Sequence, residues 1–314
     1  IWTLLGLDAK IEKFEAPESW AATDPYYSSQ LFTDEDFPPA FDTIGSGASS
    51  WWEKDKTMIW VRALNMNRDQ KDALWREIAP TDIEQGEIGN CWLIAAIAAV
   101  AAYPDVIQRT FNGAARPSAN GRYTLRLWDV REGTSGDWVE VEVDDWIPCK
   151  RHGKYERYAR SWFGRSTKED EIWPLILEKG FAKLIGSYVG LISGMAGFAW
   201  QALTGCNPIV FRSKLGQWKR SNNDVAKQRV SANTIQGRRE LSLWSWEASP
   251  LLSILQFYDE LEKLHRGGRG ILTASIAQAK HNESTGLVAD HAYSVISVFR
   301  ALLSNGTDLK MIRL

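Results

Sequence analysis

A glycine-containing turn that leads directly into a long uncharged segment is the feature that most constrains the fold. The turn is Gln85-Gly-Glu-Ile-Gly-Asn, and Cys91-Trp-Leu-Ile-Ala-Ala-Ile-Ala-Ala-Val-Ala-Ala follows at once. Such a segment predicts a helix that is buried on all sides, from Cys91 to about Ala102, ending before Pro104. The uncharged run from Ile88 to Pro104 is too short for a comfortable membrane span, so we expect a core helix and no membrane span.

Cys91 stands where the turn becomes the helix. Near the positive end of a helix dipole, beside backbone N–H groups without helical partners, a thiol is favoured as the nucleophilic thiolate. Gln85, six residues upstream, can offer a side-chain N–H to a developing oxyanion. The alternative is inert packing, because free cysteines are among the most buried residues. Gly86, Gly89, the upstream amide and the Cys-Trp pair favour catalysis over packing.

The composition is that of a folded globular protein, with 44% hydrophobic and 24% charged residues. A chain of 314 residues can bury a large core and is expected to divide into two lobes. The net charge of −2 gives no electrostatic support for nucleic-acid binding. Three widely spaced cysteines, Cys91, Cys149 and Cys206, do not look like a disulfide framework, which favours a reducing compartment, and we expect the cytoplasm.

We expect an N-terminal extension over residues 1–29, a first lobe over 30–205 that carries Cys91, and a second lobe over 206–314. The boundary is placed at Gly190–Gly205, whose glycines and small residues look like a linker or the floor of a groove. The chain starts with Ile-Trp-Thr, without Met and without a basic region followed by an apolar stretch. We therefore expect no signal peptide, and we expect the chain to be a fragment of a longer parent with additional domains.

Periodicity predicts the main elements of both lobes. In the first lobe, alternation predicts a hairpin of 122–130 with 137–144, and an apolar stripe predicts a helix over 170–188. In the second lobe we expect an amphipathic helix over 250–264 with Pro250 at its start, and strands over 270–276 and 291–299. The polar residues 206–249 have no clear assignment, and the second lobe is predicted to be mostly β.

A catalytic thiol needs a base, and the chain has four histidines. His152 and His281 lie in charged or polar loops, and His265 is expected in the last turn of a helix, where a cation is favoured. His291 is different because it opens the predicted strand His291-Ala-Tyr-Ser-Val-Ile-Ser-Val. A strand holds an imidazole rigidly, as a general base requires, so His291 is the candidate, with a structural histidine as the alternative.

Five blocks, in this order, resemble the calpain family of papain-like cysteine proteases. The turn and helix start at Gln85–Trp92 are similar to the family's oxyanion and nucleophile segment. The other blocks are Gly136-Asp-Trp-Val-Glu-Val-Glu-Val-Asp-Asp145, Glu171-Ile-Trp-Pro-Leu-Ile-Leu-Glu-Lys-Gly-Phe-Ala-Lys-Leu-Ile-Gly-Ser-Tyr188, Leu203-Thr-Gly205 and Gly286-Leu-Val-Ala-Asp-His291-Ala-Tyr-Ser-Val. The resemblance covers roughly residues 30–314, and its specificity lies in the ordered set.

The resemblance implies an α+β, papain-like core of two lobes and endopeptidase action on extended segments of protein substrates. It makes Cys91 the nucleophile, Gln85 the oxyanion donor and His291 the general acid and base. It also implies that Ca²⁺ binds in each lobe and aligns the lobes. Asp82 and Glu171 match the family's first-lobe calcium site, and carboxylate oxygens suit Ca²⁺.

The chain departs from the family pattern in two ways. It ends at Leu309-Lys-Met-Ile-Arg-Leu314, before the Asn-Pro-Trp block that holds the third catalytic residue and before the acidic segment of the second calcium site. Asp290 stands before His291, where the family usually has Gly. We therefore expect the chain as given to be weakly active or inactive, and a version extended past Leu314 to be active.

Two alternatives to a protease stay open at this point. One is a non-catalytic, calpain-like regulatory protein that binds peptides without cutting them, which Asp290 and the missing third residue favour. The other is a different Cys–His acyl transferase, such as a transglutaminase, which would incorporate amines and not cleave peptides.

Overall fold

The computed structural model describes residues 31–45, 58–66, 73–131, 136–150, 159–168, 170–206, 208, 211–214, 217–220, 251–266, 271–276, 287–288 and 290–314. The expected extension over residues 1–29 lies outside these ranges, as does most of the polar segment 206–249. Helices and strands are mixed along the described chain, which is consistent with the α+β class expected from the sequence.

The centre of the molecule is the helix α4, Cys91–Ala101. Every residue of α4 after Cys91 is buried, because the segment has no charged side chain to direct toward water. The predicted limits are confirmed, and a short helix α5, Pro104–Thr110, follows with Pro104 in its first turn. Among the described residues no single helix is long and apolar enough to cross a bilayer; α4 and α5 pass that test only as a pair, which is bent by 115°.

The second long helix, α6, spans Trp173–Ile185 and ends at Gly186, which adopts a left-handed conformation with φ of 110°. It begins three residues later than expected, because Pro174 suits only the first turn of a helix. Gly180 makes close packing possible, since a Cβ there would lie 2.2 Å from Leu125 Cδ1. The helix thereby packs against the strands β3, Arg122–Trp128, and β4, Trp138–Asp144.

Of the two interpretations of Gly190–Gly205, the linker is wrong, and the floor of a groove stays a prediction. This stretch contains the short helix η3, Val189–Leu191, and the helix α7, Ala196–Thr204, which packs against α4 and β3. Small residues on α7, among them the fully buried Ala199 and Ala202, allow this close approach. Small side chains are common both in linkers and at tight helix contacts, so composition alone does not separate the two.

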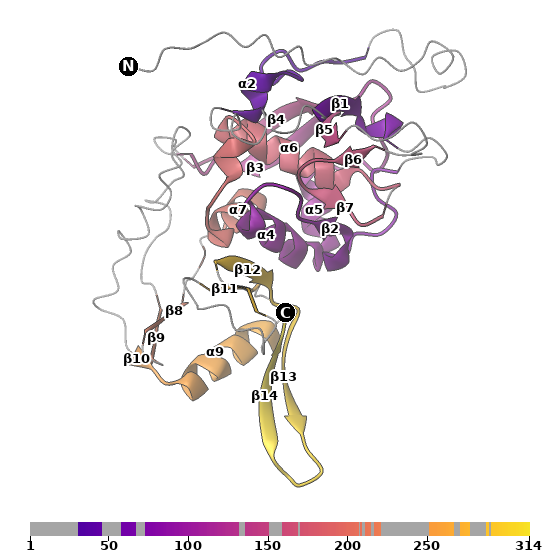
Figure 1. The fold of residues 1–314 in the computed structure, drawn as a ribbon. Coiled ribbons are helices and arrows are strands. Elements are labelled where there is room, and N and C mark those ends of the chain that lie inside the picture. The colour runs from indigo at the N-terminus through magenta and orange to yellow at the C-terminus, as the bar shows by residue number, and fades with distance from the viewer. Residues whose placement is uncertain are drawn as a thin grey trace, which may run out of the picture.

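The strands of the first half form small antiparallel sheets around these helices (Figure 1). The predicted hairpin is confirmed as β3, Arg122–Trp128, paired with β4, Trp138–Asp144, in a register that sets Leu125 opposite Val141. A second sheet has the order β1–β5–β6, and β2 pairs with β7. Their bounds are β1 Met58–Arg62, β2 Ile83–Glu84, β5 Trp146–Lys150, β6 Arg160–Ser161 and β7 Arg165–Ser166; the remaining short helices are α2 Phe41–Ile44, η1 Ala63–Asn65 and η2 Pro80–Asp82.

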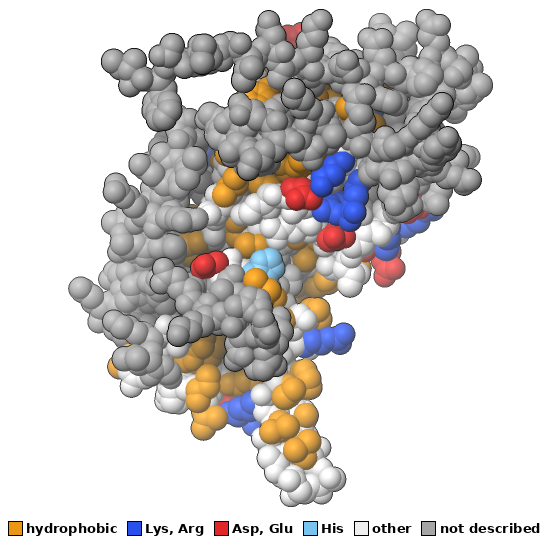
Figure 2. Space-filling view, in the orientation of Figure 1, with side chains coloured by type: hydrophobic (Ala, Val, Ile, Leu, Met, Phe, Trp, Pro, Cys, Tyr) orange, Lys and Arg blue, Asp and Glu red, His pale blue; other side chains and the backbone are white. Residues whose placement is uncertain are grey.

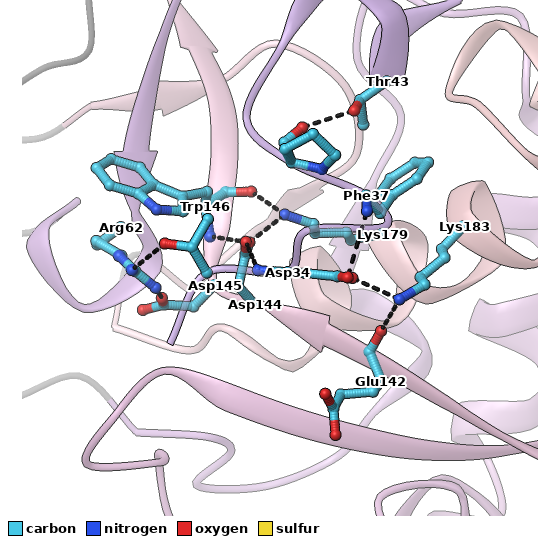
Figure 3. A network of polar contacts seen from close by, with 12 residues as sticks. Asp34, Phe37, Thr43, Arg62, Glu142, Asp144, Asp145, Trp146, Lys179 and Lys183 are labelled. Carbon is cyan, nitrogen blue, oxygen red and sulfur yellow. Dashed lines mark hydrogen bonds and ion pairs between the residues drawn. The ribbon is translucent and has the colours of Figure 1, made fainter. Parts of the chain in front are cut away.

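A buried network of charged side chains joins α6 to the strands and to the segment that starts at residue 31 (Figure 3). Asp144 accepts hydrogen bonds from the Lys179 ammonium, from the Trp146 N–H at 2.9 Å and from the Asp34 N–H at 2.8 Å. Lys183 donates to Asp34 at 2.7 Å. Lys179 and Asp144 are fully buried, so each charge depends on the other for compensation.

The second half contains a separate hydrophobic cluster of Phe257, Tyr258, Leu261 and Val298. Its helix α9, Ile254–Arg266, begins at Ile254 and not at Pro250. Leu251–Leu252 forms the strand β10 instead and pairs with β9, Gln217–Arg220. His265 lies in the last turn, as expected. The other strands are β8 Phe211–Lys214, β9 Gln217–Arg220, β11 Thr273–Ile276, β12 His291–Ser294, β13 Ser297–Leu302 and β14 Asp308–Arg313.

The single strand expected over 291–299 is two strands. β12 pairs with β11, and after Val295 the chain leaves that partner: the Ile296 N–H donates to Arg313 O at 2.8 Å and β13 pairs with β14. The β13–β14 hairpin projects from the body of the protein (Figure 1). Hydrophobic side chains gather on it, including the exposed Phe299, Leu302 and Met311 (Figure 2).

Candidate active site

Cys91 is the first residue of α4, and its thiol is half-buried and free. The turn before it is fixed against the neighbouring backbone, because the Glu87 N–H donates to Trp162 O at 3.0 Å. Gly86 is required there, since a Cβ would lie 1.8 Å from Phe163 O. The turn therefore delivers the chain to the start of the helix in one fixed path.

Asn90, the residue before the cysteine, is held by Glu178, a partner that the sequence analysis did not predict. Asn90 is buried and donates from Nδ2 to Glu178 Oε1 at 2.7 Å, while Glu178 also accepts from the Gly164 N–H at 2.9 Å. Burial raises the pKa of Glu178 to about 7, against the opposing effect of these two hydrogen bonds. The signal in the sequence is a lone glutamate in the otherwise apolar start of α6.

The residue after the cysteine is fixed equally firmly. Trp92 donates from Nε1 to Leu191 O at 2.7 Å. A Cβ on Gly194 would lie 2.4 Å from the Trp92 ring, so the indole fills the space that this glycine leaves. Cys91 is thus held between two buried neighbours while its own side chain remains partly open to solvent.

Gln85 is the first residue of this turn, and its Nε2 donates to Ile88 O at 2.7 Å. A carboxamide nitrogen carries two hydrogens, so this bond fixes the group and leaves its second N–H for another acceptor. The Cys91 backbone N–H belongs to the first turn of α4, whose donors have no carbonyl partner within the helix. Both groups have the chemistry of oxyanion donors.

His291 opens β12, where its imidazole is partly exposed and lies edge-on to Tyr293, with ring centroids 5.0 Å apart. The Tyr293 hydroxyl accepts from the Val288 N–H at 2.6 Å. Asp290, directly before the histidine, has a φ of 52°, in the left-handed region that favours glycine. The departure from the family pattern therefore falls on a residue whose backbone conformation suits glycine.

The strand that carries His291 packs on the helix that carries Cys91. β12 and α4 are in contact, and Ser294 donates from its hydroxyl to Ala95 O at 2.9 Å. In Figure 1, β11 and β12 lie next to α4. The structure thus brings together the elements of the two main candidate residues, which are 200 positions apart in sequence.

The other two cysteines differ from Cys91. Cys149 lies in β5 and is fully buried, and burial raises the pKa of its thiol far above the ordinary value. Cys206 follows α7 and is exposed. Neither stands at the start of a helix, whereas Cys91 is the first residue of α4, a position that favours a thiolate.

Asp82 and Glu171 are also brought together, but a lysine joins them. Lys168 Nζ lies 3.0 Å from Asp82 Oδ1, 3.5 Å from Glu171 Oε1 and 3.4 Å from Glu77 O. Burial disfavours the ammonium charge, but the hydrogen bond and charge of Asp82, followed by those of Glu171, raise the pKa of Lys168 overall. Two carboxylates and a carbonyl have oxygens of the kind that Ca²⁺ prefers. In this chain they surround an ammonium group, so they do not fit a calcium ion as they stand.

Comparison with known proteins identifies the relatives of this chain. A family described as "Calpain family cysteine protease" matches residues 32–314. The calpain-type cysteine protease DEK1 of Zea mays is 30% identical over 275 residues, which are 85% of this chain and 11% of DEK1. Human calpain-12 is 31% identical over 68% of this chain and 29% of its own length, and the calpain-1 catalytic subunit of Mus musculus is 32% identical over 57% and 24%. The chain spans a third or less of these relatives. With a match over almost its whole length, it belongs to the calpain family of cysteine proteases.

Proposed function

We propose that this chain is the protease core of a calpain-type cysteine endopeptidase, which cuts extended segments of protein substrates. The observation that carries the proposal is the packing of the His291 strand on the Cys91 helix, fixed by the Ser294–Ala95 hydrogen bond. Membership of the family supports it. We also propose that the substrates are proteins, that further domains accompany this core, and that the longer protein is an active protease.

In the proposed reaction, the Cys91 thiolate attacks the carbonyl carbon of the scissile peptide and forms a carbon–sulfur bond. The free N–H of Gln85 and the Cys91 backbone N–H bind the oxyanion. His291 gives a proton to the leaving amine as the carbon–nitrogen bond breaks, which leaves an acyl-enzyme. His291 then takes a proton from water, whose oxygen attacks the acyl carbon; the acid is released and the thiolate is restored.

We further propose a division into a first lobe, residues 30–205, and a second lobe, residues 206–314. Two separate hydrophobic clusters support it: one contains the buried residues from Phe37 to Leu203, and the other is built around Phe257. A cytoplasmic location is also part of the proposal, supported by three free cysteines.

The family resemblance implies calcium dependence, and we propose only a part of what it implies. Among the described residues, no three His, Cys, Asp or Glu side chains are grouped so as to hold a metal ion. The Asp82–Glu171 pair has Lys168 between its carboxylates. We therefore do not propose that this pair binds calcium. We propose that any calcium requirement of the whole protease arises from an ion bound by other ligands.

Reaction with an epoxide inhibitor of thiol proteases tests the site. We expect alkylation of Cys91, mapped by mass spectrometry, at a rate well above that of the exposed Cys206 in the same molecule. His291→Ala should reduce the rate at Cys91 and leave Cys206 unchanged. A version extended past Leu314 should in addition cleave an unfolded protein, and Cys91→Ala should abolish that cleavage. Equal alkylation rates at Cys91 and Cys206 would contradict the proposal that Cys91 is a catalytic nucleophile.

The second candidate is a peptide-binding protein of calpain fold without catalysis. The left-handed backbone of Asp290, next to His291, favours it, because this conformation suits glycine and strains an L-residue. In that case an unfolded protein would bind the extended version and be recovered uncut. Incorporation of a labelled amine into the substrate would instead indicate an acyl transferase.

A further inference from the structure

The acidic pair Asp82–Glu171 is deeply buried and incompletely bonded. The Asp82 side chain is 0% exposed, as is that of Glu171. Asp82 Oδ2 accepts the Ala79 N–H at 2.7 Å and Glu171 Oε1 accepts the Arg76 N–H at 2.9 Å. Of the other two oxygens, Asp82 Oδ1 lies 3.0 Å from the Lys168 ammonium, and Glu171 Oε2 accepts no hydrogen bond within the described part of the chain. Two buried carboxylates in this state require a cation.

Lys168 supplies that cation from the chain itself. Its side chain is 36% exposed, with the stem reaching in from the surface and the ammonium directed to Asp82, Glu171 and Glu77 O. The backbone holds Lys168 in register with this site: the Thr167 N–H donates to Asp82 O at 3.0 Å, and the Glu171 N–H donates to Lys168 O at 3.1 Å. The ammonium thus lies among three oxygen ligands that a divalent cation would otherwise use.

This arrangement lies next to the proposed oxyanion donor. Asp82 ends η2, β2 follows at Ile83–Glu84, and Gln85 comes immediately after β2. β2 in turn pairs with β7, two residues before Lys168. The lysine therefore joins the segment that directly precedes Gln85 to the segment that follows β7.

We propose that the Lys168 ammonium is a built-in cation of the Asp82–Glu171 pair, in place of the calcium ion that the family resemblance implies there, so that this part of the protein is held together without calcium. The regulatory consequence, an oxyanion turn that needs no calcium at this site, rests on the proposed function. The proposal that Lys168 is the cation of the acidic pair does not rest on the proposed function.

Calcium binding and thermal unfolding of the full chain test the proposal, in a Cys91→Ala background that excludes self-cleavage. In calcium-free buffer, Lys168→Ala should lower Tm by about 4 °C or more, because two buried carboxylates lose their counter-ion. Added calcium should restore Tm in this variant, and calorimetry should detect a binding event that the background protein lacks. Magnesium at equal ionic strength should restore less, because it demands stricter geometry.

Lys150→Ala is the matched control. Lys150 is 34% exposed and pairs with Glu87 at 2.7 Å on the surface, so its loss should change neither Tm nor calcium binding appreciably. Lys168→Arg, which keeps the charge, should stay closest to the background protein and gain no calcium response.

Two results would overturn the proposal. One is a calcium response that is identical in the background protein and in Lys168→Ala. The other does not depend on the folding of the lysine variant: calcium raises Tm of the background protein and Glu171→Gln removes that gain, which would mean that calcium binds the pair while Lys168 is present. Since both readouts are independent of peptide cleavage, failure of the proposed protease activity would leave them intact.

Discussion

The Ser294 hydroxyl donates a hydrogen bond to the backbone carbonyl of Ala95 at 2.9 Å. Ser294 ends the strand that His291 opens, and Ala95 lies four residues into the helix that Cys91 opens. The bond therefore connects the element of the proposed base to the element of the proposed nucleophile. Because Ala95 O belongs to a buried helix, this contact fixes the strand to a rigid part of the molecule.

Ser294→Ala should weaken this connection. We expect the free energy of unfolding to fall by about 1 kcal/mol, the usual value of one hydrogen bond, and alkylation of Cys91 to slow because the His291 strand is held less firmly. Ser275→Ala is the control, since Ser275 is exposed on the neighbouring strand β11, opposite Ala292. If both variants react with the epoxide as fast as wild type, the hydrogen bond does not position the histidine.

The two glycines of the Gln85 turn should respond very differently to substitution. Gly86→Ala forces a Cβ to within 1.8 Å of Phe163 O, and we expect a loss of about 3 kcal/mol or more, together with slow alkylation of Cys91. At Gly89 the nearest atom to a new Cβ is Ile192 Cγ2, at 3.8 Å, which is an ordinary contact. Gly89→Ala should therefore stay within about 0.5 kcal/mol of wild type. Denaturant unfolding measures both; equal losses would contradict the close approach of the turn to Phe163.

The elements that sequence reasoning found are those with a strong local signal. The uncharged run after Cys91 predicted α4 correctly, and alternation predicted the β3–β4 hairpin. α7 was missed because its small residues suit a linker as well as a tight helix contact. The break after Ser294 was missed because pairing with β14, and not a local turn residue, takes the chain away from β11.

The candidate site was predictable only in part, for a similar reason. Cys91 and His291 stand in recognisable blocks, but the partners that fix them come from distant segments. Glu178 is 88 residues from Asn90, and its role depends on the packing of α6 beneath the turn. Lys168 reads as a surface charge until the fold brings Asp82 beside it. A pattern indicates that a side chain points inward, but it does not indicate which group the side chain meets.

The stability of the protein should depend on pH through Glu178. Burial raises the pKa of this carboxyl from 4.5 to about 7, so the folded state binds more protons than the unfolded chain between these values. The free energy of unfolding should therefore fall as pH rises from about 4.5 to about 7, by about 3 kcal/mol from this group. Below that window the contribution is fully present, and above it the contribution is lost.

Glu178→Gln removes this titration and keeps an oxygen that can accept the Asn90 bond. Urea unfolding at a series of pH values should give a difference between wild type and variant that changes steadily across the window, in favour of the variant as pH rises. Other titrating groups contribute equally to both proteins and cancel in the difference. Parallel pH profiles for the two proteins would show that Glu178 does not titrate with a raised pKa.

Asp290 allows the backbone before His291 to be tested separately from its charge. At a φ of 52° an L-residue is strained, asparagine and aspartate tolerate the strain best, and glycine has none. We expect Asp290→Asn to unfold like wild type, Asp290→Gly to be more stable by up to about 1 kcal/mol, and Asp290→Ala to be less stable by about 1 kcal/mol. Thermal and urea unfolding measure this order.

The same three variants separate the two ways in which Asp290 can affect the histidine. If the backbone matters, alkylation of Cys91 should slow in Asp290→Ala, stay unchanged in Asp290→Asn and stay equal or increase in Asp290→Gly. If the negative charge acts on the imidazole instead, Asp290→Asn and Asp290→Gly should change the reaction to the same extent, and its pH dependence should shift in both. Equal stability of the alanine and wild-type proteins would remove the backbone explanation, because alanine cannot adopt this conformation without cost.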